Sequence, residues 1–282
     1  MAVKARLAWR ARRTWRATRL KVREQLTGVE PMAPTIERGC EIGPPHFVGV
    51  AAQRAGTSWW FELLMDHPQS YMAPGQSKEQ HFFDRYWEKP FAPTDVDRYH
   101  RRFPRPHGRK SGEWTPRYLH DFWVVPLLAR AAPDARVLVM LRDPVERYRS
   151  GVVHDMIKHS RDNKATISND ALDRGRYHSQ LTRLLGHVPR EKLLLLQYER
   201  CVADPAGEYR RTLEFLGYDD TGFVPTDLRR PVRATKTVKA PLPAHVTDEL
   251  TARLAGDVSK LATDFGDALD LSLWKNFSVS RS

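Results

Sequence analysis

Apolar residues along the chain form three short runs, separated by longer stretches with helical periodicity. The runs are residues 47–50, 136–141 and 193–196. Short apolar runs without alternation are typical of strands that are buried on both faces of a parallel sheet. Amphipathic helical patterns cover residues 57–67, 119–131, 143–159, 170–187 and 204–216. Strands that alternate with helices predict an α/β fold with a central parallel sheet flanked by helices, followed by a helical C-terminal part.

The segments between these elements carry turn and loop signals. Residues 28–46 are rich in Gly and Pro, which predicts a linker into the first strand. Residues 84–112 are rich in Pro, Arg and aromatic side chains, which predicts an irregular excursion around a helix near 95–103. We therefore expect two parts, a basic N-terminal helix with its linker at residues 1–43 and a folded domain at residues 44–282.

Positive charge is concentrated at the N-terminus. Residues 1–23 contain nine Lys or Arg side chains and no acid, which leaves 37 basic against 34 acidic residues in the rest of the chain. So small a surplus does not favour nucleic-acid binding by the folded domain, and we expect no nucleic-acid partner. Residues 1–26 also carry an apolar stripe at helical spacing. A basic amphipathic helix is typical of peripheral contact with an anionic membrane, and packing against a partner subunit or the domain is the alternative.

Composition adds an expectation about location. The chain has 41% hydrophobic and 28% charged residues, and its two cysteines match neither a disulfide framework nor zinc-ligand spacing. No signal peptide is visible, and no apolar run approaches the length of about 18 residues that a membrane span needs. We expect a cytoplasmic protein, with the inner membrane surface as the place of any peripheral contact.

The first apolar run leads into a turn that resembles an anion-binding loop. Residues 51–56 are mostly small, Arg54 adds a positive charge, and Thr57 and Ser58 stand where the next helix begins. Small residues allow the backbone to approach a ligand, and the N–H groups of a helix start point toward it. The usual P-loop places Lys directly after its last Gly, whereas here Thr57 follows Gly56. By itself the segment is a phosphate-binding loop or an ordinary strand–turn–helix corner.

A second candidate anion site follows the run at 136–141. Arg142 comes at the carboxyl end of that strand, where open α/β sheets bind ligands, and Pro144 suits the first turn of the next helix. Ser150 lies about two helical turns further along. These two residues form a second anion site at the same sheet edge, or Arg142 pairs with a neighbouring acid and Ser150 is incidental.

Four segments along the chain resemble the sulfotransferase family. AAQRAGTSWW, from Ala51, resembles the 5′-phosphosulfate loop, and LRDPVERYRS, from Leu141, resembles the 3′-phosphate site. SKEQHFFD, from Ser77, resembles the catalytic segment of the carbohydrate sulfotransferases of the heparan sulfate type, and GEWTPRYL, from Gly112, is similar to a further motif of that branch. The match spans roughly residues 45–200. The resemblance implies a P-loop NTPase-like fold and a bacterial member of this branch.

The resemblance also implies a donor, 3′-phosphoadenosine 5′-phosphosulfate, and no metal. The residues implied in binding this donor are Arg54, Ala55, Gly56, Thr57, Ser58, Trp59, Arg142 and Ser150. Arg54 is expected at the bridging and departing phosphate oxygens, and Trp59 near the adenine. Arg233 and Lys236 fall where relatives close a loop over the nucleotide, although a solvated charge run explains them as well. The family usually has Lys where this chain has Arg54. Because Arg is hard to deprotonate, this difference argues against Arg54 as a proton donor to the leaving group.

The resemblance also implies a set of catalytic residues, one of which is a general base. Glu79 is the expected base for the acceptor hydroxyl, with His81 as the competing candidate, and Lys78 is expected to orient Glu79 or the donor sulfate. Glu113 either braces the loop or touches the substrate, and Arg117 is expected to meet an anionic acceptor.

The function that follows is sulfuryl transfer to a hydroxyl of a carbohydrate or glycolipid. Two alternatives remain, a P-loop kinase that uses ATP and a nucleotide-binding adaptor without turnover that docks through its basic tail. The kinase is disfavoured by the missing Gly-Lys-Ser/Thr order. The sequence leaves the acceptor and the oligomeric state open.

Overall fold

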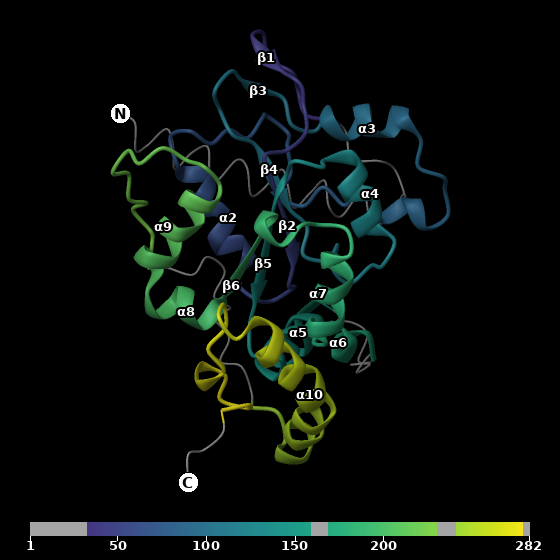
Figure 1. Cartoon of the computed structure of the whole chain (residues 1–282), viewed down its shortest axis with the longest axis vertical. Coiled ribbons are helices and arrows are strands. Elements are labelled where there is room, and N and C mark those ends of the chain that lie inside the picture. The colour runs from purple at the N-terminus through teal and green to yellow at the C-terminus, as the bar shows by residue number, and fades with distance from the viewer. Residues whose placement is uncertain (1–32, 159–168, 230–240, 279–282) are drawn as a thin grey trace.

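Four parallel strands form the centre of the molecule, in the order β4-β2-β5-β6 (Figure 1). They are β2 at Phe47–Ala51, β4 at Gly112–Trp114, β5 at Arg136–Leu141 and β6 at Leu193–Gln197. The computed structural model describes residues 33–158, 169–229 and 241–278. Every residue of β2, β4 and β6 is buried, as is β5 after Arg136. The predicted parallel sheet is confirmed, and the predicted N-terminal basic helix lies outside the described residues.

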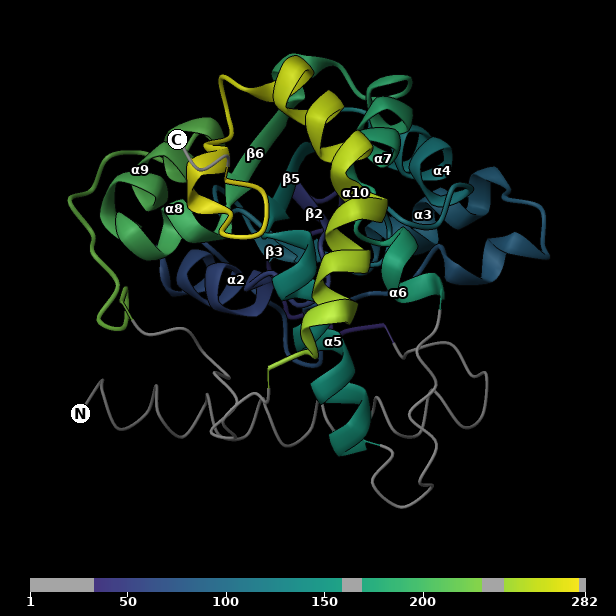
Figure 2. The same ribbon diagram turned by 90° about the horizontal axis from the view of Figure 1, so that it is seen from below.

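Helices cover both faces of this sheet. Figures 1 and 2 show α2, α8 and α9 on one side and α4 and α7 on the other. The larger helices are α2 Thr57–Asp66, α3 Pro93–His100, α4 Val124–Ala131, α5 Pro144–Lys158, α7 Tyr177–Leu185, α9 Pro205–Phe215 and α10 Ala244–Phe265. The short ones are η1 Asp84–Trp87, α6 Asn169–Asp173, η2 Arg190–Lys192, α8 Tyr198–Ala203 and η3 Leu271–Leu273. Within these ranges, no helix is both long enough and apolar enough to cross a membrane.

Long-range contacts join the helices to one another. On one face, the Trp60 indole of α2 donates to Thr212 Oγ1 of α9 at 3.1 Å, and Tyr209 of α9 donates to the Leu63 carbonyl at 3.1 Å. On the other face, α10 packs against α5 and α7. Away from the main sheet, β1 at Cys40–Glu41 pairs antiparallel with β3 at Arg105–Pro106.

One glycine allows β2 and the edge strand β4 to meet. Gly49 of β2 lies against the ring of Trp114 on β4, and a Cβ at this position would stand 2.1 Å from ring atoms. The Trp114 indole donates to the Ala51 carbonyl at 2.9 Å, which ties the end of β2 to its neighbour. The end of β2, where the loop at residues 52–56 begins, is therefore fixed to β4.

Most predicted elements are confirmed, and three differ. The predicted helix at 170–187 is wrong as a single element, because the chain turns at Gly175 between α6 and α7, where Leu254 and Pro144 pack closely on the backbone. The helix predicted from residue 119 begins only at Val124. Strand β4 has three residues and was not predicted, because so short a run has no readable alternation.

Candidate active site

The carboxyl ends of the parallel strands bring four segments to one edge of the sheet. Residues 52–56 follow β2, residues 115–118 follow β4, Arg142 follows β5 and Tyr198 follows β6. In open parallel sheets this edge is where ligands bind. The candidate site is built here.

The loop after β2 has a backbone shape that requires small or unusual residues. Gly56, at the N-terminus of α2, has a φ of +92°, and a Cβ there would lie 2.6 Å from the Tyr198 ring. Arg54 also adopts a positive φ of 69°, which is uncommon for a side chain of its size. The Ala52 N–H donates to the Met140 carbonyl at 2.8 Å, so the loop starts anchored to β5. The first N–H groups of a helix have no partner within the helix, so the start of α2 suits an anion.

Arg54 connects the two predicted anion sites. Its Nε donates to Ser150 Oγ on α5 at 3.3 Å, and its carbonyl accepts from Arg142 Nη1 at 3.3 Å. Arg142 and Ser150 thus lie directly beside the loop, as the shared sheet edge predicted, and Arg142 Nη2 also lies 3.7 Å from Glu146 Oε2, the neighbouring acid of the alternative interpretation. The Arg142 guanidinium stands 4.8 Å from the centre of the Tyr198 ring, and its buried Nε has no hydrogen-bond partner among the described residues. A buried guanidinium N–H of this kind fits an anionic ligand.

Lys78 reaches the loop from the segment 77–84. Its Nζ donates to Thr57 Oγ1 at 3.1 Å and to Ser58 Oγ at 3.2 Å, and it lies 3.5 Å from Glu79 Oε1. The Trp114 N–H donates to the Lys78 carbonyl at 2.8 Å, which fixes the backbone at this residue. Lys78 and Glu79 are therefore at the start of α2, where the resemblance put the donor sulfate.

His81 lies between two carboxylates. Its Nε2 is 3.2 Å from Glu79 Oε2 and its Nδ1 is 2.8 Å from Asp84 Oδ2. Burial alone would lower the pKa of His81, but the hydrogen bonds and charges of Asp84 and Glu79 raise it to about 9. The imidazolium therefore prevails at neutral pH, with both ring N–H groups directed at carboxylates. In that state His81 has no lone pair with which to accept a proton.

Glu113 holds the segment 77–84 in place through buried hydrogen bonds. It is fully buried and accepts hydrogen bonds from Tyr99 Oη at 2.6 Å, Thr115 Oγ1 at 2.5 Å and the Gln80 N–H at 3.2 Å. Burial raises the pKa of Glu113 to about 7. Of the two predicted roles, the structure supports the bracing role, because a side chain with 0% exposure does not reach a substrate.

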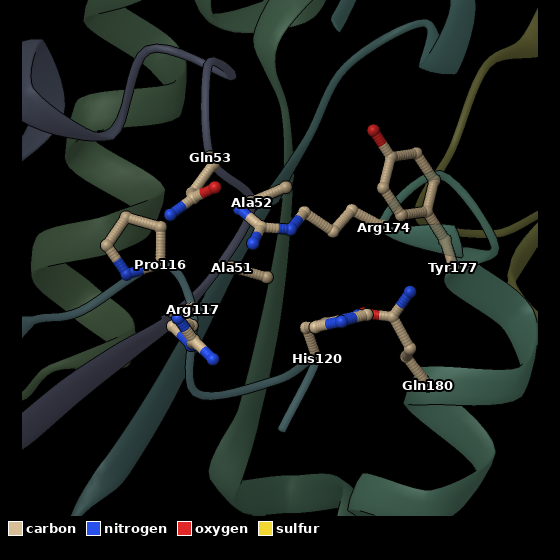
Figure 3. A pocket seen from close by; sticks show the side chains of 9 residues that line it. All are labelled: Ala51, Ala52, Gln53, Pro116, Arg117, His120, Arg174, Tyr177 and Gln180. Atoms are coloured by element: carbon tan, nitrogen blue, oxygen red, sulfur yellow. The ribbon is translucent and has the colours of Figure 1, made fainter. Parts of the chain in front are cut away.

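A small pocket opens beside the loop (Figure 3). It is lined by Ala51, Ala52, Gln53, Pro116, Arg117, His120, Arg174, Tyr177 and Gln180. Arg174 extends across it toward Ala52 and Gln53. Both guanidiniums on its wall have carboxylate partners, since Arg117 Nε is 2.5 Å from Asp121 and Arg174 Nη2 is 2.5 Å from Asp170. Arg117, the predicted contact for an anionic acceptor, therefore lies close to the loop.

An exposed aromatic cluster adjoins the catalytic segment. Trp87 at the end of η1 is 59% exposed and Phe122 is 55% exposed, and their ring centres are 5.6 Å apart. Trp123 packs against both rings, and its indole donates to the Phe83 carbonyl at 3.2 Å. We call Trp87, Phe122 and Trp123 the aromatic platform. Aromatic enrichment in 84–112 is visible in the sequence, but the pairing of Trp87 with Phe122, 35 positions later, is not.

The remaining predicted residues differ in how the structure places them. Trp59 is 1% exposed and meets Trp60 and Tyr198 edge-on, and its indole N–H has no partner among the described residues. Its position near adenine stays a prediction. Tyr198, which contacts Gly56 and Arg142, was not predicted, although it lies two positions after the run 193–196, at a strand end like the one that marked Arg142. Arg233 and Lys236 lie outside the described residues.

Over the same described ranges, no group of three or more His, Cys, Asp or Glu side chains is arranged to hold a metal ion.

This geometry of loop, cations and carboxylates can be compared with known proteins. Residues 96–222 match the family described as the Sulfotransferase family.

Two curated relatives are enzymes named for heparan sulfate. Heparan sulfate glucosamine 3-O-sulfotransferase 3A1 of Mus musculus is 30% identical over 187 residues, which cover 61% of this chain and 46% of that protein. Heparan sulfate glucosamine 3-O-sulfotransferase 6 of Homo sapiens is 28% identical over 186 residues, which cover 61% of this chain and 52% of that protein. The chain thus spans about half the length of these relatives.

Among solved structures, a sulfotransferase from Alicyclobacillus acidocaldarius is similar over the whole of its length. The TM-score is 0.65 at 25% identity, and the match covers 83% of this chain and 100% of that chain. The predicted resemblance to the sulfotransferase family, including its heparan sulfate-type branch, is confirmed by these relatives.

Proposed function

We propose that this protein transfers a sulfuryl group from 3′-phosphoadenosine 5′-phosphosulfate to a hydroxyl of a carbohydrate or glycolipid. The observation that carries the proposal is the meeting of three segments at one sheet edge, joined by the contacts of Lys78 with Thr57 and Ser58 and of Arg54 with Ser150. An anion loop, a second cation and a carboxylate base are the groups that such a transfer needs.

The donor would be held at two ends. The start of α2, with residues 55–58 and Lys78, suits the 5′-phosphosulfate, because it combines backbone N–H groups, two hydroxyls and an ammonium. Arg142 and Ser150 suit the 3′-phosphate, since the buried Arg142 Nε has no partner among the described residues. The Tyr198 ring lies between these ends, in contact with Gly56 and Arg142, and Trp59 packs against it. When bound, the donor supplies an activated sulfuryl group, and the protein supplies position and positive charge.

Glu79 would accept the proton of the acceptor hydroxyl. The raised pKa of His81, about 9, argues against the competing role for His81, because an imidazolium bonded to two carboxylates has no site for that proton. His81 instead orients the Glu79 carboxylate, and Asp84 holds His81. A positioned general base typically contributes about 10²–10⁴-fold in rate.

The surface next to the base suits a sugar ring. The aromatic platform exposes two rings beside the turn that carries Asp84, and aromatic rings pack on the apolar faces of sugars. Arg117 and Arg174 border the neighbouring pocket, where acidic groups of an acceptor would compete for their carboxylate partners. The names of the curated relatives support a carbohydrate acceptor of this kind.

Calorimetry tests the donor. We expect 3′-phosphoadenosine 5′-phosphate to bind and ATP with Mg²⁺ to bind at least tenfold more weakly, and Arg142→Ala to lower the preference for 3′-phosphoadenosine 5′-phosphate over adenosine 5′-phosphate by about 10–100-fold. Preference for ATP would favour a P-loop kinase instead. Binding of the bisphosphate without transfer of radiolabelled sulfate to heparan sulfate, chondroitin or glycolipid acceptors would favour a nucleotide-binding adaptor.

Peripheral membrane contact through residues 1–26 and a cytoplasmic location also remain proposals. The membrane contact rests on the nine basic side chains and the apolar stripe of the tail, and the location rests on the cysteine usage. Co-sedimentation with anionic vesicles should fall when residues 1–26 are removed. Equal binding by the two proteins would contradict this role for the tail.

A further inference from the structure

The cations of the candidate site are not arranged as the loop sequence alone suggests. The loop position that would reach the donor's departing phosphate carries Arg54, yet Arg54 Nε is hydrogen-bonded to Ser150 Oγ on α5, at the end expected for the 3′-phosphate. The hydroxyls at the start of α2 are contacted by Lys78, which is more than 20 positions from the loop. The amine at the start of α2 thus comes from a different segment.

The structure holds Lys78 in this position by contacts on both sides of it. The Trp114 N–H donates to the Lys78 carbonyl at 2.8 Å, and the Gln80 N–H is held by Thr115 Oγ1 at 2.9 Å and by Glu113. The Lys78 side chain is 15% exposed. A side chain that is mostly buried and aimed at the start of a helix is pre-organised for an anion, which reduces the entropy lost on binding.

Lysine and arginine differ in what they can do for a leaving group. Both supply positive charge, but an ammonium can also give up a proton, whereas a guanidinium keeps its proton in proteins. The departing bisphosphate gains one negative charge as the sulfur–oxygen bond to its 5′-phosphate breaks. An ammonium at that oxygen can neutralise this charge by hydrogen bonding or by proton transfer.

We propose that Lys78 is the catalytic cation and proton donor at the departing 5′-phosphate, and that Arg54 ties the loop to the 3′-phosphate site. The proposal rests on the proposed function. The acceptor oxygen bonds to sulfur, the bond from sulfur to the 5′-phosphate oxygen breaks, and that oxygen keeps the electron pair. Glu79 takes the acceptor proton and Lys78 gives one to the phosphate oxygen. Because Lys78 Nζ and Glu79 Oε1 are 3.5 Å apart, the proton on Glu79 can then pass to Lys78, which restores both groups.

A rescue experiment tests the proposal with full-length protein, radiolabelled donor and a heparan sulfate oligosaccharide as the acceptor probe. Lys78→Met should lower kcat about 10²–10³-fold while the Kd of 3′-phosphoadenosine 5′-phosphate changes less than tenfold. Lys78→Arg, which keeps charge and packing, should recover less than a tenth of the lost rate. Moving the lysine into the loop, as Lys78→Met with Arg54→Lys, should restore at least tenfold over Lys78→Met alone. Lys192→Met, at the opposite end of β6, is the matched control.

Phosphorus NMR of the bound bisphosphate supplies a readout that needs no acceptor. Lys78→Met should shift mainly the 5′-phosphate resonance and Arg54→Met mainly the 3′-phosphate resonance. Wild-type protein that does not bind the bisphosphate would overturn the proposed function and this inference with it. Wild-type binding with an unchanged 5′-phosphate resonance in Lys78→Met, or a double variant no faster than Lys78→Met, would overturn the inference alone.

Discussion

The loop after β2 and the segment 77–87 meet at one edge of the sheet but are built in different ways. The loop depends on backbone shape, with positive φ at Arg54 and Gly56 and a helix start within a few residues. The segment 77–87 is held by partners more than 30 positions away, such as Glu113 for Gln80 and Tyr118 for Phe82. The backbone shape of the loop is thus set largely within the loop, whereas the segment 77–87 takes its shape from tertiary contacts.

The largest expected effect is the loss of turnover when the base in the segment 77–87 is removed. Glu79→Gln should lower kcat about 10²–10⁴-fold, because the acceptor hydroxyl loses its base, while the affinity for 3′-phosphoadenosine 5′-phosphate stays within a few fold. Steady-state kinetics with calorimetry measures both. Glu88→Gln, an exposed carboxylate just beyond η1, is the control. Normal turnover by Glu79→Gln would show that the base lies elsewhere.

The second prediction concerns the brace beneath the segment. Burial raises the pKa of Glu113 from 4.5 to about 7, so the folded state binds a proton that the unfolded state releases between these values. The stabilising contribution of the neutral carboxyl is therefore complete below pH 4.5 and lost as the pH rises through about 7, by about 3 kcal/mol.

Glu113→Gln should remove this loss. Urea unfolding of wild type and variant at pH 4.5 and pH 7.5 measures how much the free energy of unfolding changes between the two pH values. Glu88→Gln is the control and should show the same change as wild type. An equal change of the free energy of unfolding with pH in wild type and Glu113→Gln would contradict the raised pKa of Glu113.

The third prediction addresses the loop. Gly56→Ala places a Cβ at a φ of +92°, 2.6 Å from the Tyr198 ring. The free energy of unfolding should therefore fall by about 1–3 kcal/mol, and the affinity for the bisphosphate should fall at least tenfold. Gly39→Ala has a similar φ of +85° with open space around the Cβ and lies away from the site. It should lose stability without losing affinity. An equal loss of affinity in both variants would mean that the loop shape has no specific role.

The smallest expected effect is on the aromatic platform. Trp87→Ala should raise KM for a heparan sulfate oligosaccharide about 3–10-fold, as for loss of a ring contact, and leave bisphosphate affinity unchanged. The exposed Val224→Ala controls for loss of surface apolar area elsewhere. An unchanged KM in Trp87→Ala would exclude the platform from acceptor binding.

Several features of the site could be predicted because they are local in the chain. The runs at 47–50 and 136–141 predicted strands, and their carboxyl ends predicted that the loop and Arg142 share one edge. The approach of Ser150 followed from helical spacing. The partner of Arg54 did not follow, because a side chain of this length can reach several places, and only the packing of α5 beside the loop selects Ser150.

The sequence by itself determined the α/β alternation and the family that the chain resembles, because these depend on periodicity and on short motifs. Tertiary structure decided how the charges are used. It placed Lys78 on the loop hydroxyls, left His81 as an imidazolium between two acids and buried Glu113 beneath the catalytic segment. The physical reason is that charge, solvation and hydrogen bonding at a site depend on neighbours in space, and strand β4, only three residues long, brings those neighbours together.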